Sequence, residues 1–453
     1  MSSQEVFTES GVEESVLGWL ENDLGWEKYK APTLDEKYDR RKDEAVYWNL
    51  LKEKLIEINE EITKENVTDF ISSLKREFSY ENLIDGNQNF LEILKKGKAF
   101  SIEDSDGTKD RRYIDLIDFE NPGDNSFVAV NQLTFRQKET IRPDIVLLVN
   151  GLPIVVGELK SSTQEKDYYD AINDLHEYEE QAKNLFIPNL FNLAIDTTDY
   201  RYGAINAPKD HYYPWRETPK KYQDIENEVK KAIYSMLNHQ TLLDILKYFV
   251  FYGEREAKTI KIIPRYMQYY ATNKIIHRIR KGRHKSGLIW HTQGSGKSYT
   301  MLFTAYKIMQ TQPIQNPRPI IIVDREKLNK QMKQDLHDVE FPNFKEANTI
   351  NHLEQMLKQD ASRTILTTIQ KFQDIDVRRE EVNFIVLSDE AHRFLEKDLG
   401  SKLEHTLPNA HHFGFTGTPV RERDRDTFNL FMPKNKQKEH NREVLKMPRS
   451  TKR

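Results

Sequence analysis

The chain has 453 residues, enough for two or three domains. It contains no cysteine, which excludes disulfide bonds and cysteine-ligated zinc and fits a reducing cytoplasm. Charged residues make up 31% of the chain but the net charge is only −4, so any contact with nucleic acid has to use local basic patches. The polar, acidic residues 1–16 do not resemble a signal peptide, and apolar runs such as 145–149 are too short to span a bilayer. We therefore expect a cytoplasmic protein without membrane contact.

The first hundred residues show the periodicity of helices. Apolar residues recur at helical spacing over 16–24, and 46–63 is a charged amphipathic segment. From about residue 110 the pattern changes to short runs rich in β-branched residues, and we expect strands at 126–132, 145–149, 154–159 and 191–197. Residues 150–153 form a hairpin turn between the second and third of these strands. A helix is expected over 166–186, and together these elements predict an α/β unit around one sheet.

A second pattern, with strands and helices in alternation, begins near residue 240. We expect a helix at 297–309 and strands at 286–290, 319–323, 364–368, 384–388 and 411–415. This order predicts a parallel sheet with crossover helices. We expect the linker between the two patterns within 205–258, and we expect disorder in the basic tail 433–453.

Two carboxylates and a lysine stand at the ends of the first predicted hairpin. Asp144 opens one strand, and Glu158 and Lys160 lie two residues apart near the end of the next, on one face. Hydrolysis of a phosphodiester needs a metal to polarise the phosphate, and Mg²⁺ prefers carboxylate oxygens. The pattern predicts a nuclease site in which Asp144 and Glu158 bind Mg²⁺ and Lys160 orients or helps to deprotonate water. A hairpin with solvated charges is the alternative, but it is less natural at the end of such apolar strands.

The helix that follows carries Asp174 and Tyr178, four residues apart on one face. Two interpretations stay open for this pair: contact with the active site or DNA, or an ordinary amphipathic face. Upstream, Glu13 and Glu14 are expected to be surface carboxylates rather than further ligands.

A glycine-rich loop lies between the predicted strand 286–290 and the helix 297–309. Such a loop turns backbone N–H groups toward phosphates at a helix N-terminus. His291 stands where the strict pattern has a glycine. Lys297 is expected to reach the β- and γ-phosphates and Ser298 to hold Mg²⁺. The full set of residues expected to bind ATP in this loop is Thr292, Gly294, Ser295, Gly296, Lys297 and Ser298.

Four further segments agree with a nucleotide-driven motor. Asp389 is expected to hold Mg²⁺ through water and Glu390 to polarise the attacking water. Gln268, about thirty residues before the loop, is expected to read the adenine edge. Residues 324–325 and 367–370 follow strands that face the expected DNA side, and 414–419 is a tight turn that couples the nucleotide site to DNA.

The chain resembles the R (restriction, motor) subunit of type I restriction enzymes from about residue 10 to about residue 432. The segments that carry the resemblance are 114–132, 142–160, 290–301, 323–331, 387–394 and 411–419. The resemblance implies an endonuclease domain of the PD-(D/E)xK fold over 1–240, with its core at about 110–205, and a RecA-like superfamily-two lobe over 255–432. It also implies Mg²⁺ and ATP as cofactors, double-stranded DNA as substrate, and assembly with modification (methyltransferase) and specificity subunits. In such enzymes ATP-driven translocation of DNA is coupled to cleavage.

The chain departs from this family's pattern in two places. Asp174 stands where the family often has the glutamine of Gln-x-x-x-Tyr, and a carboxylate cannot donate the hydrogen bonds of an amide. Only 34 residues follow Pro419 (453 − 419), whereas a second RecA-like lobe needs on the order of 150. We therefore expect a C-terminally truncated R subunit that lacks the second lobe and does not translocate alone.

Two other classes of function stay open. One is a superfamily-two helicase or repair ATPase whose N-terminal domain binds DNA without cutting it. The other is an inactive remnant.

Overall fold

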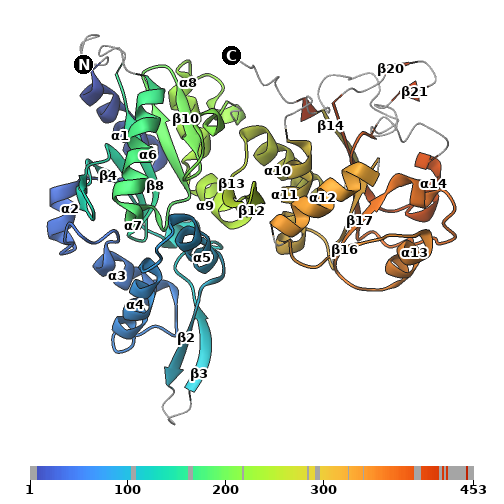
Figure 1. Cartoon of the computed structure of the whole chain (residues 1–453), viewed down its shortest axis with the longest axis horizontal. Helices are drawn as coiled ribbons and strands as arrows, with labels where there is room; N and C mark the ends of the chain where they lie inside the picture. Colours follow the sequence, from blue (N-terminus) through green and yellow to red (C-terminus); the bar gives the residue numbers. More distant parts are fainter. Residues whose placement is uncertain are drawn as a thin grey trace. The chain divides into compact units, whose positions relative to one another are not determined.

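The computed structural model describes residues 8–103, 109–161, 167–216, 219–282, 285–290, 296–324, 326–339, 341–391 and 399–417, with the backbone of 421–422, 425–426 and 445–446. The chain forms two compact units, Met1–Ile263 and Pro264–Arg453 (Figure 1). None of the helices in the described part of the chain combines the length and the apolar character that crossing a membrane requires.

The first unit is built on a mixed sheet of seven strands. Their order across the sheet is β1 (Glu27–Lys30), β4 (Phe127–Asn131), β7 (Ile145–Val149), β8 (Leu152–Leu159), β9 (Phe191–Ile195), β10 (Tyr200–Gly203) and β11 (Tyr213–Pro214). The pairs β1–β4 and β8–β9 are parallel, and the other neighbours are antiparallel. Strands β7, β8 and β9 are buried along their whole length, which explains their almost unbroken apolar sequence.

The predicted hairpin is confirmed, but its turn is shorter than the expected 150–153 because β8 already begins at Leu152. Asn150 and Gly151 alone separate β7 from β8, and both have positive φ angles, 52° and 83°. Such a turn matches the twist of two antiparallel strands, and asparagine followed by glycine is its preferred sequence. The turn fixes the register that brings the far ends of β7 and β8 together.

Helices surround this sheet. They are α1 (Glu9–Leu24), α2 (Ala31–Lys37), α3 (Trp48–Ile58), α4 (Val67–Lys75), α5 (Leu83–Lys96), α6 (Tyr168–Gln181), α7 (Lys183–Phe186), α8 (Glu228–Met236) and α9 (His239–Tyr248). Helix α1 packs on β4 and β8, and α6 packs on β8 and β9. The single helix expected over 166–186 is wrong at one point, because the backbone of Ala182 leaves the helical region between α6 and α7.

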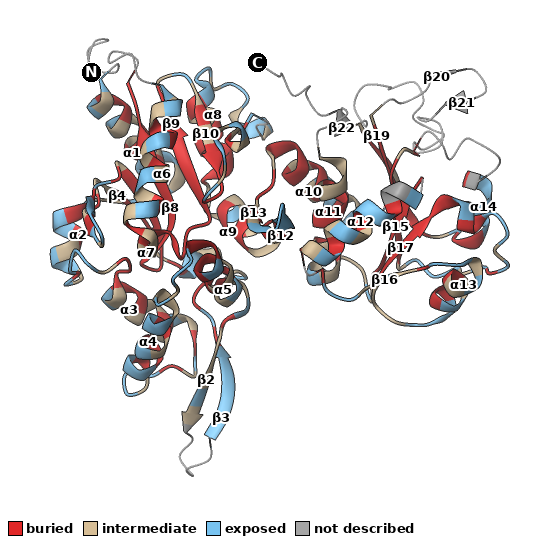
Figure 2. Cartoon of the chain, in the orientation of Figure 1, coloured by how far each residue is buried: buried red, intermediate tan, exposed pale blue. Residues whose placement is uncertain are grey.

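Small hairpins complete the first unit. They are β2 (Lys98–Glu103) with β3 (Lys109–Ile114), β5 (Phe135–Arg136) with β6 (Thr140–Ile141), and β12 (Phe251–Arg255) with β13 (Lys258–Ile262). The first of these extends as a ribbon beyond α4, and the outer residues of β3 are exposed (Figure 2).

The linker expected within 205–258 is not found there. These residues form α8, α9 and the first strand of the β12–β13 hairpin, all within the first unit. Helix α8 packs on α1, and the Trp26 indole donates a hydrogen bond to the carbonyl oxygen of Leu237 at 3.0 Å. The two helices have only 9 and 10 residues, so their apolar spacing is hard to distinguish from a loop rich in lysine and tyrosine.

The second unit confirms the predicted parallel sheet with crossover helices. The strand order is β16 (Phe344–Glu346), β17 (Thr364–Thr368), β15 (Arg318–Val323), β18 (Phe384–Ser388), β19 (His411–Thr416), β14 (Ser286–Trp290) and β22 (Leu445–Lys446), and every neighbouring pair is parallel. Strands β14, β17 and β18 have the predicted bounds. The expected disordered tail lies outside the described residues except for β22.

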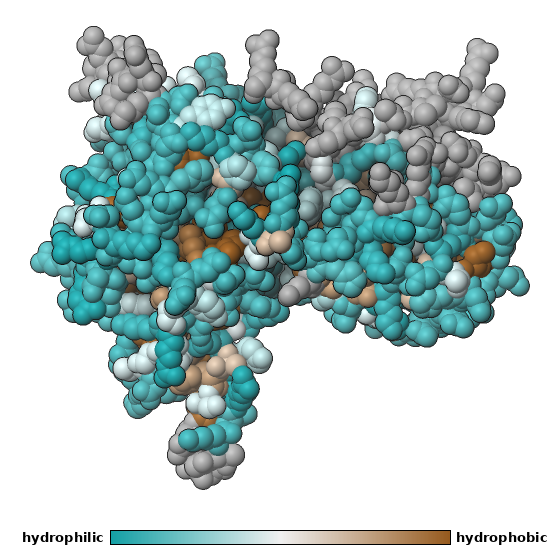
Figure 3. Space-filling model, viewed as in Figure 1, coloured by the Kyte–Doolittle hydropathy of each residue, from teal (hydrophilic) through white to brown (hydrophobic). Residues whose placement is uncertain are grey.

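The helices of the second unit are α10 (Tyr266–Lys281), α11 (Lys297–Thr311), α12 (Glu326–Asp338), α13 (Ile350–Lys358) and α14 (Leu399–Thr406), and a small hairpin joins β20 (Arg421–Glu422) to β21 (Arg425–Asp426). Figure 2 shows the buried sheet strands between helices whose outer faces are exposed. The exposed face in Figure 3 is mainly hydrophilic, as the high fraction of charged residues requires.

Candidate active sites

The predicted nuclease residues lie together at one end of the β7–β8 hairpin. Ile145 pairs with Gly157 across the two strands, so Asp144 lies next to Glu158. The Asp144 N–H donates to Glu158 Oε1 at 3.3 Å, and the Leu159 N–H donates to Asp144 Oδ2 at 2.8 Å. Lys160 Nζ lies 3.2 Å from Glu158 Oε2. The structure thus brings Asp144, Glu158 and Lys160 to one point from two adjacent strands.

This cluster is buried, and burial controls its protonation. Glu158 is 3% exposed and Lys160 5% exposed. Burial raises the pKa of both Asp144 and Glu158, and the charge of Asp144 raises that of Glu158 further. Burial alone would lower the pKa of Lys160, but its hydrogen bond to Asp174 and the charge of Glu158 raise the pKa above the ordinary value. Lys160 is therefore an ammonium group at neutral pH. Beside it, the negative charge of Asp144 makes ionisation of Glu158 less favourable.

Helix α6 contributes two more side chains, which decides between the two interpretations of its polar face. Asp174 Oδ2 lies 2.6 Å from Lys160 Nζ. Tyr178 lies one turn further along α6, and burial, followed by the charges of the nearby Glu158 and Asp174, raises its pKa. Asp174 and Tyr178 both contact the candidate active site.

Helix α1 adds acidic residues that the sequence did not assign to this site. Glu9 Oε1 lies 3.9 Å from Lys160 Nζ. Glu13 Oε2 accepts a hydrogen bond from Asn131 Nδ2 at 2.7 Å, and the charge of Glu13 contributes to the raised pKa of Asp144. Glu13 is thus half-buried at the edge of the site, whereas Glu14 is exposed, as expected of a surface carboxylate. The spacing of four residues between Glu9 and Glu13 was the available signal.

The donor set of this site fits a hard divalent cation. The carboxylates of buried Glu158 and half-buried Asp144 lie at one point, and a cation there would offset the desolvation that raises their pKa values. Among the described residues, no group of three or more histidine, aspartate or glutamate side chains has the arrangement of a complete metal site. Mg²⁺ commonly binds through one or two carboxylates and keeps several waters, so two such ligands are sufficient.

The predicted nucleotide residues meet at the carboxyl end of the parallel sheet in the second unit. Lys297 is the first residue of α11, and it follows Gly296, whose φ is 81°. Lys297 Nζ lies 2.6 Å from Glu390 Oε1 and 3.9 Å from Asp389 Oδ1. Ser298 is half-buried beside Lys297. Thr292, Gly294 and Ser295, expected in the same loop, lie outside the described residues.

Asp389 offers a cation a buried oxygen. Its Oδ1 is inaccessible to solvent and accepts no hydrogen bond within the described part of the chain. Burial raises the pKa of Asp389, and the positive charge of the nearby Lys297 offsets part of this rise. A buried carboxylate oxygen without a hydrogen-bond donor fits the expected role in binding Mg²⁺.

Gln268 supports the phosphate loop from helix α10. Its Nε2 donates to the carbonyl oxygen of Gly296 at 3.1 Å, and its Oε1 accepts from the Arg265 N–H at 2.8 Å. Both ends of the amide are thus used within the protein, between the start of α10 and the start of α11.

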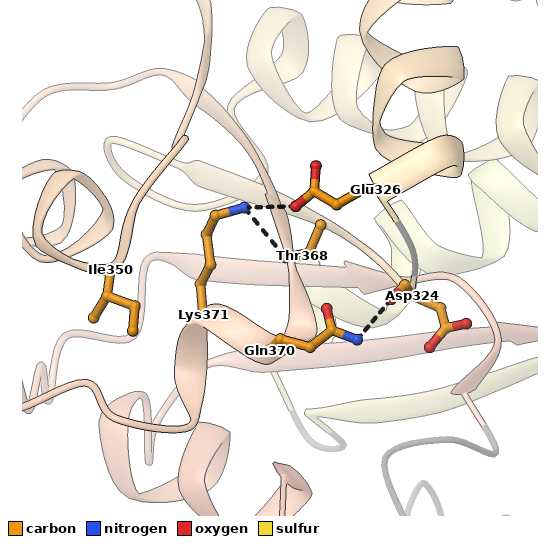
Figure 4. A pocket seen from close by; sticks show the side chains of 6 residues that line it. All are labelled: Asp324, Glu326, Ile350, Thr368, Gln370 and Lys371. Carbon is orange, nitrogen blue, oxygen red and sulfur yellow. Dashed lines mark hydrogen bonds and ion pairs between the residues drawn. The ribbon is translucent and has the colours of Figure 1, made fainter.

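A hollow of about 400 Å³ lies where β15 and β17 end (Figure 4). Lys371 Nζ donates to Thr368 Oγ1 at 3.2 Å, and Gln370 Nε2 donates to the carbonyl oxygen of Asp324 at 2.7 Å. Glu326 and Ile350 complete its lining. The segments expected to face DNA therefore do meet, although Arg325 lies outside the described residues. In the predicted coupling turn the Gly417 carbonyl accepts from the Trp290 indole at 3.3 Å, and Thr418 and Pro419 are not described.

Comparison with known proteins agrees with the division of the chain into two units. Residues 6–211 match the family described as type I restriction enzyme R protein N terminus, and residues 267–438 match SWI2/SNF2 ATPase. The chain is 32% identical to the type I restriction enzyme HindI endonuclease subunit of Haemophilus influenzae, over 94% of this chain and 44% of that protein. It is 29% identical to a putative type I restriction enzyme MjaVIIIP endonuclease subunit of Methanocaldococcus jannaschii, over 94% of this chain and 43% of that protein.

Among solved structures, the SWI2/SNF2 ATPase core of Sulfolobus solfataricus in complex with double-stranded DNA is similar over 36% of this chain and 34% of that one. Its TM-score is 0.30 and its identity 14%, values too low to support an assignment.

The fold and the matched regions define a protein in which an R protein N-terminal domain precedes an ATPase domain of the SWI2/SNF2 type. The chain belongs to the family of type I restriction enzyme endonuclease subunits. It spans less than half the length of the two relatives named above.

Proposed function

We propose that this chain supplies the DNA-cleaving and ATP-binding parts of the R subunit in a type I restriction–modification system. The convergence of Asp144, Glu158 and Lys160 from two buried strands carries the proposal. Bringing charged groups together where they lose contact with water costs free energy. Such an arrangement is more typical of a functional site than of a hairpin with solvated charges. This arrangement supports a nuclease domain of the PD-(D/E)xK fold within residues 1–240, with its core at about 110–205.

Each residue of the nuclease site has a separate role in this proposal. Asp144 and Glu158 would hold Mg²⁺, which supplies polarisation of the scissile phosphate of double-stranded DNA. Lys160, held beside Glu158 and Asp174, would orient the attacking water through the hydrogen bonds that its ammonium donates. Tyr178 lies close enough to Glu158 for the two groups to influence each other electrostatically, so it would help to set the charge of this carboxylate.

In the ATPase lobe, which belongs to the unit that begins at Pro264, Lys297 and Ser298 would hold the phosphates and Mg²⁺ of ATP together with Thr292, Gly294, Ser295 and Gly296. Asp389 would bind the same cation, and Glu390 would orient the attacking water. In the assembled enzyme, located in the cytoplasm, modification and specificity subunits would recognise the DNA site. ATP-driven translocation would then deliver distant DNA to the nuclease site.

Nicking of supercoiled plasmid with and without Mg²⁺ tests the nuclease proposal. We expect the wild-type chain to nick DNA only with the cation, and Asp144→Asn, Glu158→Gln and Lys160→Ala each to lower the rate at least about a hundredfold. Glu180→Gln, an exposed carboxylate on α6, is the matched control and should nick at the wild-type rate.

Two outcomes would favour the other classes of protein. DNA binding and ATP hydrolysis without nicking, under any divalent cation, would support a helicase or repair ATPase with a DNA-binding N-terminal domain. Absence of nicking, DNA binding and ATP binding would support an inactive remnant.

A further inference from the structure

Among the described residues, Asp174 forms the shortest ion pair with Lys160. Lys160 Nζ lies 2.6 Å from Asp174 Oδ2, against 3.2 Å from Glu158 Oε2 and 3.9 Å from Glu9 Oε1. The lysine side chain is 7% exposed and that of Asp174 38% exposed, so the aspartate connects a buried ammonium to the surface of α6. The three carboxylates come from three different elements, α1, β8 and α6.

A lysine at an active site needs such anchors because its side chain is long and flexible. Fixing its rotamers costs conformational entropy, and a mobile ammonium orients water poorly. Glu158 cannot be the lasting anchor, because the proposed role of Glu158 is to bind the cation. Asp174 lies on α6, whose buried residues Ala171, Ile172 and Leu175 hold the helix against the sheet. Asp174 is therefore the anchor that does not compete with metal binding.

We propose that Asp174 is the positioning residue of Lys160, taking the place of an amide in this chain. A carboxylate accepts from the ammonium in a charge-assisted hydrogen bond, which is about twice as strong as a neutral one. An ionised aspartate only accepts hydrogen bonds. It can therefore bind the lysine ammonium but cannot donate a hydrogen bond to a backbone carbonyl or to another carboxylate. This inference rests on the proposed nuclease function, and it assigns a second task to α6 beside that of Tyr178.

A double-mutant cycle tests the proposal through DNA nicking. Asp174→Ala should lower kcat about tenfold or more while the KM for DNA stays within twofold, as expected for a group that supports a ligand-bearing centre. In the Lys160→Ala background, Asp174→Ala should have no further effect, because its target is gone. Asp174→Asn should recover part of the rate, since its Oδ1 still accepts from the lysine. Additive losses in the double variant would overturn the proposal.

A second measurement does not depend on activity. Acetylation of lysines by a water-soluble ester, followed by mass spectrometry, reports how accessible Lys160 is in the whole chain. We expect faster labelling of Lys160 in Asp174→Ala than in wild type, with no change in Glu180→Gln. Equal labelling in wild type and Asp174→Ala would refute the positioning role. If the wild-type chain fails to nick DNA while labelling rises as expected, the ion pair stands and the nuclease proposal fails.

Discussion

Lys297 Nζ lies 2.6 Å from Glu390 Oε1, so the lysine proposed to bind phosphate is paired with the glutamate proposed to orient water. The two side chains are 15% and 27% exposed, and solvent screens such a pair only in part. In the proposed ATP site, bound phosphates would therefore compete with Glu390 for the same ammonium. The ion pair would then connect nucleotide binding to the position of the residue proposed to orient water.

The first prediction follows from this competition. Glu390→Gln removes the competing charge, so ATP should bind about two- to fivefold more tightly, corresponding to up to about 1 kcal/mol. Hydrolysis should fall by about 10² or more, because the group that orients water is lost. Titration with a fluorescent ATP analogue and an assay of phosphate release measure the two effects. Lys297→Ala, which should abolish binding, is the control, and weaker binding by Glu390→Gln would contradict the argument.

The second prediction concerns pH and the nuclease cluster. Burial raises the pKa of Asp144 and Glu158, so between about pH 4 and their raised values the folded unit holds more protons than the unfolded chain. Their contribution to stability is therefore most favourable at low pH and falls as pH rises. In the absence of divalent cations, Glu158→Gln should raise the Tm at pH 8 by about 2–4 °C, equivalent to about 1 kcal/mol, and have little effect near pH 4.

Thermal denaturation of wild type and variant at several pH values checks this result. Mg²⁺ should stabilise the wild-type chain more at pH 8 than at pH 5 and should stabilise Glu158→Gln less at both. The same dependence on pH in the two proteins would contradict a buried, proton-binding Glu158.

The sequence predicted much of the fold because several strands are short apolar runs between turn residues. Strands β7, β14, β17 and β18 begin and end where the patterns of 145–149, 286–290, 364–368 and 384–388 do. The period of two residues along β8 also placed Glu158 and Lys160 together. Helices α8 and α9 were missed because they are short and their burial depends on packing with α1 and its neighbours, which local periodicity does not contain.

The same distinction applies within the nuclease site. Asp144 and Glu158 are joined by a hairpin, so their proximity follows from local sequence. Glu9 and Glu13 approach the site only because α1 packs on β4 and β8, more than a hundred residues away along the chain. The sequence does not determine whether Asp174 faces the site or solvent. The packing of α6 on β8 and β9 places it against Lys160.

The third prediction concerns the base of the nucleotide. Because both ends of the Gln268 amide are bonded within the protein, Gln268→Ala should weaken the phosphate loop rather than a contact to adenine. We expect affinity for ATP and for GTP to fall by a similar factor of about five, the equivalent of one hydrogen bond. Competition of each nucleotide against a fluorescent analogue measures this. A loss confined to ATP would show instead that Gln268 reads the adenine.

The last prediction concerns the turn that fixes the register of the nuclease hairpin. Gly151 has a φ of 83°, and a Cβ there would lie 2.7 Å from the carbonyl oxygen of Tyr47. For alanine, the positive φ angle alone costs about 1–2 kcal/mol. Its Cβ would also clash with the backbone at the start of α3, which cannot move freely. Gly151→Ala should therefore lower the free energy of unfolding by about 2 kcal/mol or more, and denaturant titration of the chain measures it.

Gly123 is the matched control for this change, because a Cβ added there meets nothing within 4 Å. Gly123→Ala should leave both stability and nicking near the wild-type level. In Gly151→Ala the nicking rate should fall together with stability, since a shift in register moves Asp144 away from Glu158 at the other end of the two strands. Full nicking activity in a destabilised Gly151→Ala protein would mean that the turn does not set the geometry of the cluster.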